Sequence, residues 1–154
     1  DEVIKAFGQV MKFVCNNSIT RGTAVRFVDI NDKLCVETYT NSGLRAEDEK
    51  AAFLGIALND ATDGQTAYVC TKGITTVELE NSGSGTIRCG SYGIIISSDN
   101  GKITALSAEN SITSNSRGVL ISVNTVAGYF VETLSLSLST RRALFYVKGN
   151  FEFD

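Results

Sequence analysis

The sequence predicts an all-β protein, built as a small barrel-like or sandwich unit. Apolar and polar residues alternate with a period of two along several short segments, as in strands that bury one face. Turn-forming Gly, Asn, Asp and Ser cluster between these segments at short intervals. Together the segments predict about ten short strands, which is typical of sandwiches and small barrels rather than of an α/β sheet.

The individual strands follow from this alternation. The clearest segment is 134–140, in which every Leu falls on one face and every Ser on the other. Segment 92–96 contains three consecutive Ile and predicts a strand that is buried on both faces. The other alternating segments are 34–37, 76–80 and 151–153. The turn signals between strands are residues 31–32, 41–43, 63–64, 81–85 and 99–101.

Three further segments are assigned from their composition. Residues 1–17 are predicted to form either an N-terminal arm or the first strand. Several of them are too apolar to be left in water, so we expect the segment to pack against other residues. Residues 44–52 are rich in Ala, Glu and Lys and free of β-branched residues, which predicts one short helical insertion. Residues 141–154 predict a C-terminal strand.

A β-rich pattern occurs twice, in predicted repeat units 18–80 and 85–136. Each unit opens on an Ile, at Ile19 and at Ile87, and continues into an apolar run and a polar turn. Each later contains an apolar run that begins with Gly and ends with Asn. The pattern predicts an internal duplication within a single domain of residues 1–154. A repeated β unit of this kind favours a binding or assembly surface over a reaction centre.

Composition and charge narrow the class of protein. The chain has 154 residues and no evident linker, so we expect one domain with a substantial core. Its net charge is −3, and the largest basic cluster is the pair Arg141-Arg142, unlike the basic stripe of a nucleic-acid-binding protein. No apolar stretch approaches the roughly 20 residues that span a bilayer, and the chain starts without a signal-like segment. We therefore expect neither a nucleic-acid nor a membrane partner.

The four cysteines indicate a reducing compartment. Cys15, Cys35, Cys70 and Cys89 are scattered among apolar segments and form no C-x-x-C pair. This pattern favours reduced thiols in the core. Two disulfides are the alternative. A metal site is less favoured, because four distant thiolates would have to converge without help from any His.

The residue types and spacings of common catalytic sites are absent. The chain contains no His, so it has no Ser-His or Cys-His pair. Glu47, Asp48 and Glu49 are consecutive and would diverge around a helical turn. Residues 29–32 begin like a calcium loop but lack its Gly and Glu, and residues 101–104 lack the upstream Gly of a phosphate loop. We expect no enzyme activity, no catalytic residue, no cofactor and no metal.

Sugar binding stays open as an alternative. Sugar-binding β modules usually stack their ligands on exposed aromatic rings, most often Trp, and this chain has no Trp. Its five Tyr residues lie in strand-like segments, where a core or rim position is the default expectation.

The stretch from Ile19 to Leu79 resembles the capsid decoration, or cement, proteins of tailed bacteriophages. The resemblance rests on a Gly-led strand start at residues 22–25, a run containing Gly-Ile-Ala at residues 53–61, and a return strand at residues 63–74. The insertion at 44–52 and the region after Thr140 have no counterpart in that family. The capsid contacts of the family therefore do not carry over residue by residue.

The resemblance implies a structural virion protein that is made in the host cytoplasm and binds the outer surface of a phage head. Its expected partners are the major capsid protein and further copies of itself, with a trimer favoured, and it would stabilise contacts between capsomers. The alternative is a head-fibre, spike or adhesin-type β module that binds a glycan or protein on a cell surface. The candidate residues for capsid or subunit contacts are Val3, Ile4, Phe7, Ser135, Ser137, Arg141 and Arg142.

Overall fold

The computed structural model describes residues 7–39, 53–80, 85–95, 101–105, 125–137 and 142–148. These residues are all-β, as predicted, and contain no helix. The predicted helical insertion at 44–52 lies outside them. In chain order the strands are β1 (Phe7–Cys15), β2 (Ser18–Ile19), β3 (Ala24–Ile30), β4 (Lys33–Thr38), β5 (Phe53–Ala57), β6 (Ala61–Thr62), β7 (Thr66–Glu78), β8 (Thr86–Ile87), β9 (Tyr92–Ile95), β10 (Thr104–Ala105), β11 (Thr125–Phe130), β12 (Leu134–Ser135) and β13 (Arg142–Val147).

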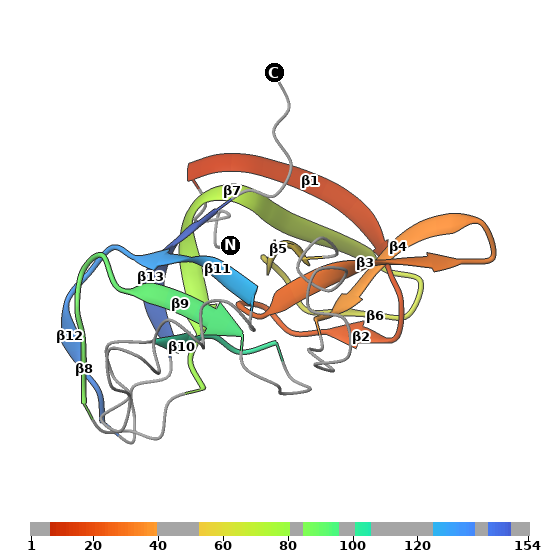
Figure 1. Ribbon diagram of the computed structural model, residues 1–154. Coiled ribbons are helices and arrows are strands. Elements are labelled where there is room, and N and C mark those ends of the chain that lie inside the picture. The colour runs from red at the N-terminus through yellow and green to blue at the C-terminus, as the bar shows by residue number, and fades with distance from the viewer. Residues whose placement is uncertain are drawn as a thin grey trace.

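Nine strands form one mixed sheet in the order β1-β4-β3-β5-β7-β13-β11-β9-β10. The long strand β7 is its centre (Figure 1). β1 pairs with residues 66–74 of β7, β5 pairs with residues 69–70, and β13 pairs with residues 73–78. The two short pairs β2–β6 and β8–β12 form separate two-stranded sheets. β7 therefore connects two structural halves of the domain.

The first half is a ring of strands. β1 pairs with β7 and also with β4, so the path β1-β4-β3-β5-β7 returns to its start. The β1–β4 contact consists of two parallel register pairs, Val14 with Cys35 and Cys15 with Val36. From β7 the sheet continues in the other direction through β13, β11, β9 and β10. The sheet as a whole is therefore not closed into a barrel, and the predicted barrel-like character is limited to the ring.

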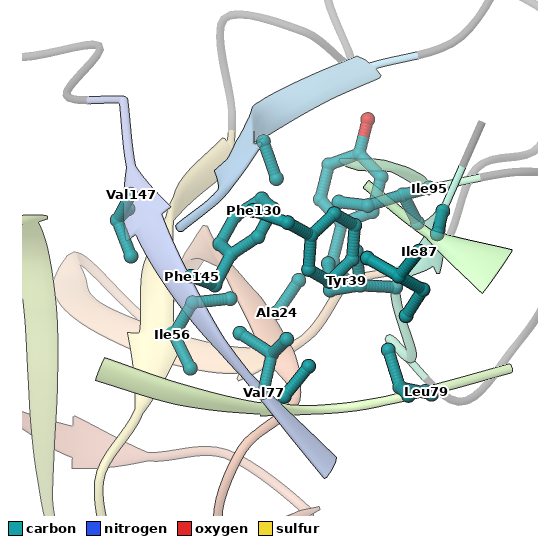
Figure 2. Close-up of a cluster of buried hydrophobic side chains, with 14 of the residues drawn as sticks. Ala24, Tyr39, Ile56, Val77, Leu79, Ile87, Ile95, Phe130, Phe145 and Val147 are labelled. Carbon is teal, nitrogen blue, oxygen red and sulfur yellow. The ribbon is translucent and has the colours of Figure 1, made fainter. Parts of the chain in front are cut away.

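Two apolar clusters fill the domain. The smaller draws on all five ring strands and on β2 and β6. The larger lies against β13, β11, β9 and β10 and contains Tyr39, Phe53, Phe130 and Phe145 (Figure 2). Its rings pack edge to face, with centroids 6.0 Å apart for Tyr39–Phe53 and 4.9 Å for Phe130–Phe145. β5 is buried along its whole length and supplies side chains to both clusters.

Several predicted alternations are confirmed. Val77 and Leu79 are buried and their neighbours on either side are not. In segment 92–96, Gly93, Ile94 and Ile95 are all buried as predicted, but Tyr92 is 47% exposed, so the prediction is wrong there, and Ile96 lies outside the described residues. In the 134–140 segment, Leu136 is buried and both Ser135 and Ser137 are exposed; residues 138–140 lie outside the described ones.

The alternation predicted for residues 34–37 is wrong at Leu34, which is 57% exposed. Leu34 lies near the end of the β3–β4 hairpin, which projects from the body of the domain (Figure 1). The turn itself is confirmed. Asn31 and Asp32 have φ of 52° and 64°, as a two-residue type I′ hairpin turn requires.

The predicted domain parts map onto this fold as follows. Unit 18–80 holds β2 to β7, and unit 85–136 holds β8 to β12. β1 occupies residues 7–15 of the segment 1–17, and β13 occupies residues 142–147 of the segment 141–154. Whether the two units descend from one duplicated sequence stays a prediction.

Candidate functional site

The structure separates the interface residues that the sequence singled out. Phe7 is the first residue of β1 and the register partner of Ile74, whereas Val3 and Ile4 lie outside the described residues. Ser135 belongs to the small β12–β8 sheet, and Ser137 follows it. Arg142 begins β13 in the large sheet, and Arg141 is outside the described part. The predicted set therefore does not form one site among the described residues.

A different surface stands out on the outer side of the open half of the sheet. Tyr92, Tyr129 and Tyr146 are consecutive register partners across β9, β11 and β13, and Tyr146 in turn pairs with Ile74 of β7. Directly paired residues point to the same side of a sheet, so these four side chains form one row. Leu144 pairs with Thr76 next to this row. We call the six residues Tyr92, Tyr129, Tyr146, Ile74, Leu144 and Thr76 the tyrosine face.

The tyrosine face is open to solvent and largely apolar. Tyr92 is 47% exposed, Tyr129 40% and Leu144 42%. Tyr129 and Tyr146 stack with ring centroids 5.0 Å apart and an interplanar angle of 27°. Because side chains stand roughly perpendicular to a sheet, this stacked pair directs its edges and hydroxyl groups outward and covers part of its ring faces. Tyrosines presented in this way are common at the centres of protein–protein contacts.

Cationic groups lie at both ends of this face. At one end, Lys72 follows the row on β7 next to Ile74, and Lys148 follows it on β13 next to Tyr146; both lysines are exposed. Neither lysine makes an ion pair with a described residue. Two lysine amines beside exposed aromatic rings can bind the carboxylates of a partner.

At the opposite end, Arg142 forms an ion pair with Glu78, its register partner. The hydrogen bond to Glu78 and the charge of that carboxylate raise the pKa of Arg142. Arg21 and Thr76 line the same cavity of about 120 Å³. The predicted interface residue Arg142 thus lies at the margin of the tyrosine face, with its charge already matched by Glu78.

A second apolar surface lies on the ring. Val14 and Leu34 are 49% and 57% exposed and line a shallow groove of about 360 Å³. The remaining lining residues are Lys12, Phe13, Thr66 and Tyr68. This groove is at the opposite end of β1 from Phe7 and is separate from the tyrosine face.

The described residues contain no group of three or more Cys, Asp or Glu arranged to hold a metal ion. Within the same part of the chain, no helix could cross a membrane. Every buried side-chain nitrogen or oxygen described has a hydrogen-bond partner.

The cysteines differ in environment more than the sequence predicted. Cys15, Cys35 and Cys70 are buried, as expected, but Cys89 is exposed, and the prediction of a core position is wrong for it. Cys89 follows the short β8, where its backbone N–H donates to Oγ1 of Thr133 at 3.0 Å, so it lies outside the packed sheet. All four thiols are free in the structure.

Thiol labelling of the native protein at pH 8 should therefore modify Cys89 first. Burial raises the pKa of Cys70 from its usual 9.0 to about 11, so only about a thousandth of that thiol is ionised at pH 8. Burial also raises the pKa of Cys15. Peptide mass analysis should show rapid modification of Cys89 alone, and modification of all four thiols after denaturation without reductant. Equal native labelling of Cys70 and Cys89, or cysteines left unmodified after denaturation, would contradict this assignment.

Sequence reasoning missed the tyrosine face for an identifiable reason. The strands that carry it are apolar at consecutive positions, as in residues 143–147, so alternation could not show which side faces water. The tyrosines themselves could have indicated this surface, because the Tyr side chain combines an aromatic ring with a polar hydroxyl group and so tolerates exposure to solvent. The default core or rim assignment is correct for Tyr39, which is fully buried, and wrong for Tyr92 and Tyr129.

The fold of this chain is similar to that of a solved phage protein structure. No protein-family model and no curated protein sequence matches the chain. Among solved structures, the crystal structure of the head fiber gp8.5 N base in bacteriophage phi29 is similar, with a TM-score of 0.53. The two share 13% sequence identity over 94% of this chain and 100% of that chain. At this identity the likeness concerns the fold alone.

Proposed function

We propose that this protein is a structural component of a bacteriophage virion, a decoration protein that binds the outer surface of the head and stabilises contacts between capsomers. The observation that carries the proposal is the likeness in fold, over nearly the whole chain, to the base of a phage head fiber. The resemblance of residues 19–79 to capsid decoration proteins points independently to the same location.

The physical properties of the domain suit this role. A protein that holds capsomers together resists tension, which requires a rigid body and extended contacts. The large sheet with two packed apolar clusters provides rigidity, because close-packed interiors deform little. The tyrosine face and the ring groove offer two separate contact surfaces. The expected partners are the major capsid protein and further copies of the chain, with a trimer favoured, and neither nucleic acid nor membrane.

A head-fibre base is the second candidate, and one specific observation favours it. The similar solved structure is a head fiber protein rather than a decoration protein. Both functions place the chain on the outside of the head. They differ in their effect on the shell, because a decoration protein stabilises contacts between capsomers and a fibre base anchors a fibre.

Binding to phage heads tests the proposal. Purified protein mixed with heads that lack it should sediment with them, saturably and in proportion to the number of capsid subunits. Heads of an unrelated phage are the control. Bound protein that leaves the stability of the heads against heat unchanged would select the fibre base. A failure to bind heads, together with binding to host cells, would contradict both functions and favour an adhesin.

A further inference from the structure

The β3–β4 hairpin ends in an exposed tip that is both apolar and acidic. We define the hairpin tip as residues 29–34, all of which are exposed. Its large apolar side chains are Ile30 and Leu34. Its charged residues are Asp29, Asp32 and Lys33, which give two negative charges and one positive charge. The tip therefore combines apolar side chains with a small excess of negative charge.

The base of the hairpin is held rigidly. Arg26 and Glu37 are register partners and form an ion pair at 2.9 Å. The other carboxylate oxygen of Glu37 accepts a hydrogen bond from the side-chain amide of Asn16 at 2.8 Å, which ties the hairpin to the end of β1. A rigid hairpin loses little conformational entropy when its tip is bound.

The tyrosine face complements this tip. It presents exposed rings and Leu144 in its centre, with Lys72 and Lys148 at one end. The carboxylate at its other end, Glu78, is already paired with Arg142. A partner for this face therefore has to bring apolar groups and carboxylates together, and the hairpin tip has both.

We propose that the hairpin tip of one copy docks on the tyrosine face of a second copy, so that copies associate head to tail. In this contact Leu34 and its register partner Asp29, which share one side of the hairpin, lie against the tyrosine rings and toward Lys72 and Lys148. Asp32 approaches the same two lysines from the turn. The inference deepens the homo-oligomer of the proposed function and rests on that part of it.

Charge distinguishes this arrangement from the alternatives. Two tyrosine faces placed against each other would bring cations together without free carboxylates to match them. A sugar would need open ring faces, and the stacking of Tyr129 on Tyr146 covers part of these. The contact of tip and face joins opposite charges and covers apolar area on both sides.

The positions of the two surfaces also fit head-to-tail assembly. The hairpin projects from one end of the molecule, while β9, β11 and β13 lie at the other end (Figure 1). A contact between two different surfaces forms a closed ring when the rotation between copies returns to its start. Each copy in a ring then makes two contacts, which strengthens an interface that is individually small.

Charge reversal tests the contact. The tip variant carries Asp29→Lys and Asp32→Lys, and the face variant carries Lys72→Glu and Lys148→Glu. All four positions are exposed, and an unchanged melting temperature will show that each variant is folded. Arg88→Glu reverses an exposed charge outside the tyrosine face, the ring groove and the hairpin tip, and is the control. Light scattering after size exclusion measures the mass of each protein.

We expect the wild type and Arg88→Glu to form the same closed multimer, and each double variant to be monomeric, with at least about a tenfold loss of affinity. A mixture of the two variants should associate again at a 1:1 ratio, in assemblies with an even number of copies, because each contact between unlike variants joins opposite charges. Combining all four substitutions in one chain should restore the multimer for the same reason.

Three results would overturn the inference: a wild type that is monomeric, double variants that keep the wild-type mass, or a mixture that stays monomeric. If the face variant keeps its mass but loses binding to heads, the face binds the shell protein, and the contact between copies is wrong. Binding to heads is measured separately. A monomer that still binds heads leaves the decoration function standing, whereas a multimer that binds no heads contradicts the decoration function alone.

Discussion

Gly55→Ala should destabilise the folded domain by about 4 kcal/mol or more, one of the largest losses expected from a single methyl group. A Cβ at Gly55 would lie 2.2 Å from the carbonyl oxygen of Cys70 and 3.0 Å from Cα of Thr71. Both atoms belong to the backbone of β7 and cannot rotate away. The β5–β7 contact consists of two register pairs, so the added methyl would push apart strands that have few bonds to hold them.

The consequence would extend to both halves of the domain. Leu54 and Ala57 of β5 belong to the smaller apolar cluster, and Phe53 and Ile56 belong to the larger one. A displaced β5 would therefore loosen both. Denaturant unfolding measures the loss.

Gly90→Ala is the matched control for Gly55→Ala. Gly90 has a positive φ of 91° but no atom within 4 Å of the added Cβ, so only the backbone strain of about 1–2 kcal/mol applies. Equal effects at Gly55 and Gly90 would mean that β5 and β7 are not in the close contact described.

Phe145→Ala should lower the free energy of unfolding by about 3–5 kcal/mol, the usual result of removing a fully buried aromatic ring. The ring of Phe145 packs against Phe130 and covers Gly93, where a Cβ would be only 2.3 Å from its Cε1 atom. Its loss would open a cavity between β13, β11 and β9, in the middle of the larger apolar cluster (Figure 2).

The adjacent residue gives a sharp comparison with Phe145→Ala. Leu144 is on the opposite side of the same strand and is 42% exposed, so Leu144→Ala should cost no more than about 1 kcal/mol. Thermal unfolding of the two variants tests which side of β13 faces the core. A larger loss for Leu144→Ala would place the tyrosine face inside the molecule and remove it as a binding surface.

The all-β class and many of the strands could be predicted because alternation and turn residues act locally. The turn at Asn31 and Asp32 and the burial of Val77 and Leu79 depend on neighbours in sequence, and both are confirmed. The parallel contact of β1 with β4 and the position of β7 between the two halves depend on pairing between distant segments. No local pattern specifies such pairing.

The candidate site was less accessible to sequence reasoning than the fold. Leu34 was expected to be buried because it alternates with polar neighbours, yet a hairpin that extends beyond the core has no buried side near its tip. In β13 both sides of the strand are apolar, so the outward position of Tyr146 depends on which side meets the larger cluster. Among the predicted interface residues that the structure describes, Arg142 borders the tyrosine face, and Phe7 is the register partner of its member Ile74, whereas Ser135 and Ser137 lie elsewhere.

Electron microscopy of virions purified from cultures that produce this protein tests the proposed function most directly. The proposal predicts that the protein is present in purified particles and that density fitting its nine-stranded sheet lies on the outer surface of the head, repeated at equivalent lattice positions. A protein that is made during infection but is absent from purified virions would contradict the proposal.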